Sequence, residues 1–164
     1  MDHKTHDEKI KKLSELIKDI DIAMLTTVDE DGSLRSRPMG TQEVEFDGDL
    51  WFMTAIDTGK ANEILRESRV NVSYAKPGDN RYVSVSGTAV LIDDKAKIDE
   101  LWSPIYKAYF PEGQDDPRLR LLKVRVEKAE YWESLGLIST IIGFTQAMLG
   151  KESDIAENQK IMLG

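Results

Sequence analysis

The chain has 164 residues, no cysteine and a formal net charge of −8 at pH 7. The length indicates one domain, the lack of cysteine excludes disulfide scaffolds and thiolate metal sites, and the acidic balance argues against nucleic-acid binding. No stretch reaches the roughly 20 apolar residues of a membrane-spanning helix, and the charged N-terminus does not have the form of a secretory signal. We therefore expect one cytoplasmic domain over residues 1–164, with neither nucleic acid nor membrane as a partner.

Hydrophobic periodicity is helical near the N-terminus and strand-like over most of the chain. Apolar residues from Ile10 to Ile20 recur at helical spacing and predict a helix over about residues 5–19, within an N-terminal segment of residues 1–20. Short runs rich in β-branched residues, bounded by Gly, Asp and Pro turns, predict antiparallel strands. The expected strands cover residues 22–28, 34–45, 50–54, 70–75, 82–92 and 119–131.

Capping residues predict further helices between these strands. Thr58 can cap a short helix that runs to about Ser68, with Ile64 and Leu65 facing inward. Asp94 can cap a second helix, and Ser103 followed by proline can start a third. These two helices are expected at residues 94–102 and 103–110, and a C-terminal helix at residues 137–149 lies within a segment, 134–164, that ends in a polar tail.

Glycine and proline inside the expected strands indicate a curved sheet. Pro38 and Gly40 are expected to bend the second strand, because proline cannot donate to a strand ladder. Gly87, inside the longest apolar run, is typical of a bulge or a barrel corner. About six short antiparallel strands with flanking helices predict a mainly β fold, a small and partly closed barrel, although a sandwich with added helices also fits the pattern.

The clearest functional signal is a small group of cations in an acidic stretch. Residues 21–60 hold nine acidic residues but only three cations, Arg35, Arg37 and Lys60. The two arginines are two positions apart on an expected strand and so point to one face. Lys60 lies in the first turn of the helix after Thr58, where a cation opposes the helix dipole unless an anion is also bound. This arrangement predicts a phosphate pocket. Ordinary surface pairing is the alternative, with Lys60 on Asp57 or Glu63 and the arginines on neighbouring acids.

Four motifs in order resemble a known family of flavoproteins. The chain, over about residues 12–133, resembles the pyridoxamine phosphate oxidase-like proteins, which share an FMN-binding split β-barrel, and in particular their general stress protein branch. The spacing of Thr54, Thr58 and Lys60 reproduces a threonine, hydroxyl and lysine pattern of the oxidase. The motifs are Arg35-Ser36-Arg37-Pro38-Met39-Gly40, Trp51-Phe52-Met53-Thr54 with Thr58-Gly59-Lys60, Tyr82-Val83-Ser84-Val85-Ser86-Gly87, and Ala129-Glu130-Tyr131-Trp132.

The resemblance implies a cofactor, a set of residues that binds it and a partner. FMN is the expected cofactor, with FAD as a further possibility, and the flavin would lie in a groove between the two subunits of a homodimer. The phosphate would be held by cations, the ring and ribityl chain would lie along strand backbone, and two aromatic residues would lie near the flavin. The resemblance implies that the phosphate is bound by Arg35, Arg37, Thr58, Gly59 and Lys60. The backbone of residues 37–39 and 53–54, which includes Pro38, Met39, Met53 and Thr54, would line the ring and the ribityl chain. The two aromatic residues are Tyr82, where the oxidase has a glutamine, and Trp132.

Departures from the oxidase pattern bear on activity. The oxidase has an arginine where this chain has Gly59, and Arg35 is the candidate to replace it. Basic residues that grip the oxidase's substrate are missing after Trp132, so pyridoxamine phosphate oxidation is not expected. No catalytic acid or base and no metal ligand set stands out. We therefore expect an FMN-dependent oxidoreductase of unknown substrate, and the alternatives are a non-catalytic protein that stores or senses flavin, or a barrel that binds nothing specific.

Overall fold

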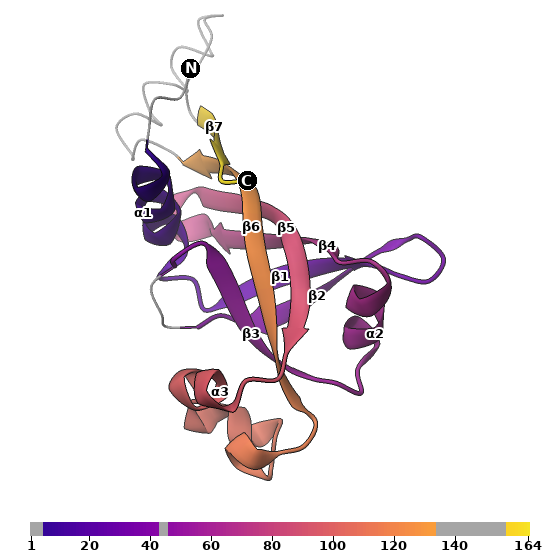
Figure 1. Cartoon of the computed structure of the whole chain (residues 1–164). Helices are drawn as coiled ribbons and strands as arrows, with labels where there is room; N and C mark the ends of the chain where they lie inside the picture. The colour runs from indigo at the N-terminus through magenta and orange to yellow at the C-terminus, as the bar shows by residue number, and fades with distance from the viewer. Residues whose placement is uncertain (1–4, 43–45, 134–156) are drawn as a thin grey trace, which may run out of the picture.

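The computed structural model describes residues 5–42, 46–133 and 157–164, whose strands curl into a single open barrel with helices around it (Figure 1). The described strands form one antiparallel sheet in the order β2-β1-β4-β5-β6-β3, and β7 pairs with β6 beside this path. The elements are α1 (His6–Ile17), β1 (Ile22–Val28), β2 (Leu34–Gly40), β3 (Asp49–Ala55), α2 (Gly59–Arg66), β4 (Arg69–Lys76), β5 (Arg81–Ile92), α3 (Lys95–Leu101), β6 (Leu119–Glu133) and β7 (Glu157–Met162), with 3₁₀ turns at Pro77–Asp79, Pro104–Ala108 and Gly113–Asp115.

A β-bulge accounts for the curl of the long central strands. The β5–β6 register shifts between Ser86 and Gly87, as the glycine inside the apolar run predicted. A Cβ atom at Gly87 would lie 2.2 Å from the carbonyl oxygen of Arg125, so no side chain fits there. The close approach of the two backbones therefore requires glycine, and the bend it permits brings β3 round toward β2 at the other end of the strand order.

The mainly β split-barrel prediction is confirmed, and the sandwich alternative is wrong because the described strands form one sheet. The first helix, the strands and the caps Thr58 and Asp94 agree closely with the expected elements. The second strand ends at Gly40 rather than continuing toward residue 45, and Ser103 makes no side-chain cap to the 3₁₀ turn that follows it. The expected helix at residues 137–149 lies outside the described residues.

Two further expectations are wrong. Leu65 was expected to face inward with Ile64, but the side chain of Leu65 is 72% exposed and that of Ile64 is 3% exposed. Only one stripe of so short a helix can contact the sheet, and Ala61, Glu63 and Ile64 occupy it. A polar tail with no strand was expected at the C-terminus, yet Glu157–Met162 forms β7 and pairs with the last six residues of β6.

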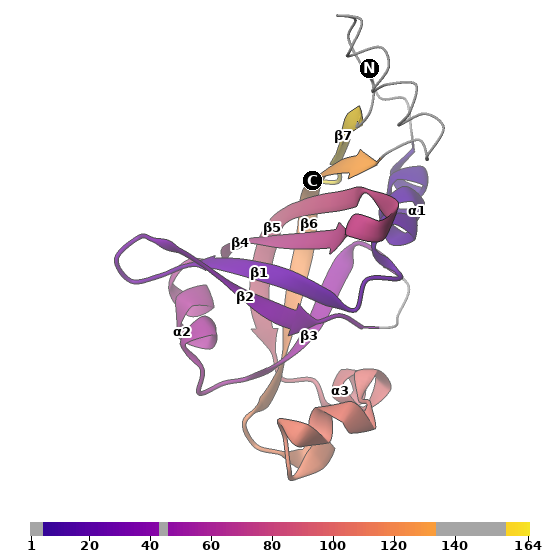
Figure 2. The ribbon, with the colours of Figure 1, turned by 180° about the vertical axis from the view of Figure 1, so that it is seen from behind.

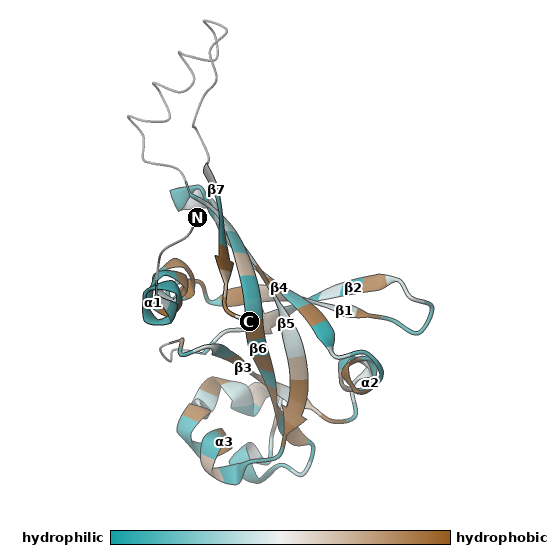
Figure 3. Cartoon of the chain, turned by 45° about the horizontal axis from the view of Figure 1, so that its top comes forward, coloured by the Kyte–Doolittle hydropathy of each residue, from teal (hydrophilic) through white to brown (hydrophobic). Residues whose placement is uncertain are grey.

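The core has two parts, one inside the barrel and one on the opposite face of β3 and β6, because Phe52 and Leu122 belong to the first and their neighbours Met53 and Leu121 to the second. Figure 3 colours these strands by hydropathy. The larger part packs α1 and α2 against the inner face of the sheet, around Leu25, Phe52 and Val85. The smaller part packs α3 and the following turns against β3 and β6 around Met53 and Leu121. Alternating burial along β1 and β5 leaves one face of the sheet outside the barrel. Within residues 5–42, 46–133 and 157–164, no helix combines the length and apolar character needed to cross a membrane.

Candidate functional site

Helix α2 begins at a side-chain cap beside the end of β3. The Thr58 hydroxyl accepts a hydrogen bond from the Ala61 amide at 3.4 Å and donates one to the Ala55 carbonyl at 2.9 Å. This confirms the cap predicted from the sequence, and it fixes the first turn of α2 relative to the sheet (Figure 2). Gly59 and Lys60, the first two residues of the helix, are thereby held next to strand β2.

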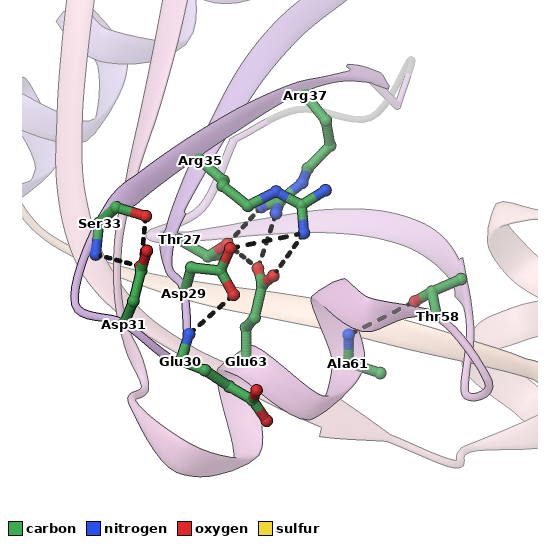
Figure 4. A network of polar contacts seen from close by, with 10 residues as sticks. All are labelled: Thr27, Asp29, Glu30, Asp31, Ser33, Arg35, Arg37, Thr58, Ala61 and Glu63. Atoms are coloured by element: carbon green, nitrogen blue, oxygen red, sulfur yellow. Dashed lines mark hydrogen bonds and ion pairs between the residues drawn. The ribbon is translucent and has the colours of Figure 1, made fainter.

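Strand β2 presents its two arginines to α2. The β1–β2 register places Arg35 opposite Thr27 and Arg37 opposite Leu25, both of which are buried on the inner face of the sheet. Because side chains alternate along a strand, Arg35 and Arg37 share this inner face with Met39. The two guanidinium groups reach toward one carboxylate on α2, that of Glu63 (Figure 4).

Glu63 is the buried centre of this cluster. Its side chain is 3% exposed, and Arg35 Nη1 donates to Oε1 at 2.9 Å while Arg37 Nη2 donates to Oε2 at 2.7 Å. The Thr27 hydroxyl also donates to Oε2 and accepts a hydrogen bond from Arg37 Nη1. Burial alone would raise the pKa of the Glu63 carboxyl, but the hydrogen bonds from Thr27 and Arg37 and the charges of both arginines together hold that pKa below its ordinary value.

Lys60 belongs to the same cluster but makes no ion pair with the described residues. Its ammonium lies 3.6 Å from the Met39 sulfur and is half-buried. Burial lowers the pKa of Lys60, and the nearby charge of Arg37 lowers it further. The alternative of ordinary pairing is therefore right for the arginines, which bind Glu63, and wrong for Lys60, which binds neither Asp57 nor Glu63.

The cluster carries more positive than negative charge. Three cations face the buried carboxylate of Glu63 and the carboxylate of Asp29, whose oxygen lies 4.0 Å from Arg35 Nη1, so one positive charge is in surplus. A Cβ built on Gly59 would lie 3.9 Å from the same Arg35 nitrogen, so the Arg35 guanidinium is beside the position where the oxidase has its arginine. The surplus charge and the start of α2 suit an anion such as a phosphate monoester.

The end of β3 contributes one unsatisfied polar atom. The side chain of Thr54 is 2% exposed, and its hydroxyl oxygen has no hydrogen-bond partner among the described residues. Such a buried hydroxyl costs free energy unless a further group satisfies it. Met53 directs its side chain into the smaller core cluster, so only its backbone is available at this point. Within the part of the chain that the structure describes, the Thr54 hydroxyl and the Lys60 ammonium are thus two polar groups that a polar ligand would satisfy.

The remaining predicted residues lie on the outer face of the sheet. Tyr82 and Trp132 are directly opposite each other on β5 and β6, and both line a groove of about 310 Å³ together with Met24. Pro38 faces outward, opposite Met24, because it alternates with the inward arginines. The predicted site is therefore divided between the two faces of the sheet, which meet at β2, an edge strand in the strand order.

Sequence reasoning did not assign Glu63 or Thr27 to the site. Both are buried polar residues, and both occupy positions where an inward apolar residue would be expected. Thr27 continues the inward alternation of Ala23 and Leu25, and Glu63 lies beside Ile64 one helical turn after Lys60. A polar residue in an inward register position is a signal for a buried partner, and here that partner is the arginine pair.

Comparison with known proteins identifies the family. A family model described as pyridoxamine 5′-phosphate oxidase like matches residues 8–154. The chain belongs to this family. Protein bli-3 of Neurospora crassa is 30% identical to it over 161 residues, which cover 92% of this chain and 72% of that protein. The resemblance inferred from the four motifs is thereby confirmed.

Solved structures similar to this member of the pyridoxamine 5′-phosphate oxidase-like family include proteins named for general stress. A general stress FMN/FAD binding protein from Xanthomonas citri is 29% identical, with a TM-score of 0.66 over 81% of this chain and 93% of that chain. A structure from Jannaschia sp. CCS1 named general stress protein 26 is 24% identical, with a TM-score of 0.73 over 93% of this chain and 96% of that chain, and shows the shared fold.

Proposed function

We propose that this protein is a flavoprotein that binds FMN through the cation cluster between β2 and α2. The observation that carries the proposal is the convergence of Arg35 and Arg37 on the Glu63 carboxylate beside the ammonium of Lys60, which leaves surplus positive charge at the start of a helix. A phosphate monoester matches this charge better than a neutral ligand. The family membership and the name of the Xanthomonas citri relative support a flavin as the ligand that carries the phosphate.

The residues at the cluster divide the binding of the cofactor among them. Lys60, Arg35 and Arg37 would neutralise the phosphate, and the Gly59 amide would donate a hydrogen bond to it. The Thr58 hydroxyl would do the same by turning its O–H from the Ala55 carbonyl to the phosphate. The Lys60 ammonium, which makes no ion pair with the described residues, supports this role. FAD remains the second candidate, because the same cations can bind a pyrophosphate.

The flat part of the cofactor would lie at the edge of the sheet. The backbone of residues 37–39 and 53–54 would line the isoalloxazine and ribityl chain, and the unsatisfied Thr54 hydroxyl offers a hydrogen bond there. Tyr82 and Trp132 border the outer groove and would lie near the ring system. We further propose a homodimer in which a second copy covers this groove, because Ile22, at 57% exposure, and Tyr82, at 42%, leave its rim open to solvent.

A bound flavin would supply electron transfer, and the protein would bind it, orient it and exclude water from it. We propose an oxidoreductase whose substrate is not assigned. Storage or sensing of flavin without turnover is the alternative, because the one carboxylate in the cluster, among the described residues, is already engaged by both arginines.

The first experiment is to identify what co-purifies with the protein. We expect an absorption spectrum with the two visible bands of an oxidised flavin, and a released ligand with the mass of FMN. A released ligand with the mass of FAD would change the cofactor, and a colourless protein that binds no added FMN would contradict the proposal. Addition of NADH or NADPH, followed by an electron acceptor, then separates the two functions: repeated reduction and reoxidation favours the oxidoreductase, and a stable unreduced flavin favours storage or sensing.

A further inference from the structure

Glu63 has the wrong charge for a residue at the centre of an anion site. A carboxylate near a bound phosphate repels it, and burial of a carboxylate is costly unless it is paired. The structure nevertheless buries Glu63 to 3% exposure in the middle of the cation cluster. Glu63 must therefore make favourable interactions that outweigh both the repulsion of the phosphate and the cost of its own burial.

The hydrogen bonds of Glu63 explain how it organises the cluster. Each carboxylate oxygen binds a different arginine, Oε1 binding Arg35 and Oε2 binding Arg37, and the Thr27 hydroxyl binds Oε2 as well. A guanidinium has five N–H groups, of which Arg35 uses one in these hydrogen bonds and Arg37 uses two. The others make no hydrogen bond to the described residues, so both arginines keep donors for a ligand.

Without Glu63, the three cations would repel one another. Burial lowers the pKa of Lys60, and the positive charge of Arg37 lowers it further because like charges repel. The side chain of Arg35 is 56% exposed and would be free to move into solvent without the bond to Glu63. A buried, hydrogen-bonded carboxylate thus offsets the repulsion and restricts both guanidinium groups.

We infer that Glu63 is a positioning residue: its carboxylate holds the guanidinium groups of Arg35 and Arg37 side by side so that their remaining N–H groups receive the phosphate of the ligand. This inference rests on the proposed function. The inference predicts that replacement of Glu63 lowers the affinity for the phosphate. Removal of the negative charge alone would strengthen phosphate binding, whereas loss of the arginine arrangement weakens it, and the inference requires the second effect to be larger.

The test compares two ligands in a charge-removing variant, Glu63→Gln. Glutamine keeps the size of the side chain but replaces one of the two acceptor oxygens with an NH₂ group, so one arginine loses the oxygen that it binds. We expect the affinity for FMN to fall at least about tenfold, while the affinity for riboflavin, which lacks the phosphate, stays unchanged. Glu67→Gln is the matched control, because Glu67 lies at the other end of α2 and pairs with Arg69.

An unchanged or higher affinity of Glu63→Gln for FMN would overturn the inference, and so would an equal loss of both ligands with a lower melting temperature. If Glu63→Gln does not fold, Thr27→Val removes one hydrogen bond from the same carboxylate and should weaken FMN binding about threefold to tenfold with riboflavin unaffected.

Measurements on the flavin-free protein separate this inference from the proposed function. Guanidinium rotation can be followed by NMR of the arginine side-chain nitrogens, and we expect rotation of Arg37 to be slow in the unmodified protein and faster in Glu63→Gln. Equal rates in the two proteins would overturn the inference. If the unmodified protein binds no flavin, the proposed function fails, and the rotation rates still decide whether Glu63 holds Arg37.

Discussion

Arg37 and Lys60 contribute differently to the cation cluster. The side chain of Arg37 is 18% exposed and fixed by two hydrogen bonds. Lys60 is half-buried, and its ammonium contacts the Met39 sulfur but makes no ion pair with the described residues. An ammonium in these surroundings loses hydration without gaining a carboxylate, which is the physical reason for its lowered pKa. A bound phosphate would restore the missing counter-charge, so both residues should matter more for FMN than for a flavin without phosphate.

At the scale of single residues, we predict that the double variant Arg37→Ala, Lys60→Ala purifies as a folded protein without FMN. Two charge-assisted contacts to the phosphate are removed, which corresponds to an affinity loss of about a hundredfold or more. Flavin content per subunit, measured by absorbance after denaturation, checks the result. Lys107→Ala, an exposed cation on the 3₁₀ turn Pro104–Ala108, should retain the full flavin content. Full flavin content in the double variant would refute the assignment of the phosphate site.

At the scale of elements, local sequence patterns predicted most of the helices and strands. Caps at Thr58 and Asp94, and the alternation along the strands, are short-range signals, and the elements they predict are present. The strand β7 was missed because its pairing with β6 depends on a partner far away in the sequence. The convergence of the two arginines with Lys60 could be predicted from strand alternation and the resemblance. The role of Glu63 could not, because it follows from the packing angle of α2 on the sheet rather than from spacing.

The close approach of β5 and β6 gives a prediction for these two strands. Gly87→Ala places a methyl group 2.2 Å from the Arg125 carbonyl oxygen, so the backbones must move apart. We expect the free energy of unfolding to fall by about 1–3 kcal/mol or more. Chemical denaturation measures this change, and Gly78→Ala, where a Cβ meets nothing within 4 Å, should be close to neutral. Equal stability of the two variants would show that the bulge does not depend on glycine.

At the scale of the whole molecule, one chain leaves open the part of the outer face that β1, β4 and β5 form with the end of β6. It carries the groove beside Tyr82 and Trp132, and exposed apolar residues such as Ile22 and Met24 line it. The cations lie on the other face, so one chain offers the phosphate site and the groove on two sides of the edge strand β2. This division is why we expect a second copy to complete the flavin site.

The homodimer prediction can be tested by placing a charge on this face. We expect the unmodified protein to sediment as a dimer and Met24→Glu to shift toward monomer with loss of flavin, because a carboxylate buried between subunits lacks a partner. Ile105→Glu changes another exposed apolar residue, at 72% exposure, away from the groove and should leave the dimer intact. Analytical ultracentrifugation of the three proteins gives the answer, and a monomeric unmodified protein that binds FMN fully would contradict the shared site.

Pro38 has a consequence for how this sheet avoids self-association. Its nitrogen carries no hydrogen, and because it is opposite Met24 within the β1–β2 ladder, that nitrogen faces away from β1, toward the outer edge of β2. An incoming strand would find a missing donor in the middle of that edge, which makes β2 a poor template for fibril-like growth. A small ligand, which needs only a few backbone contacts, is not penalised in the same way.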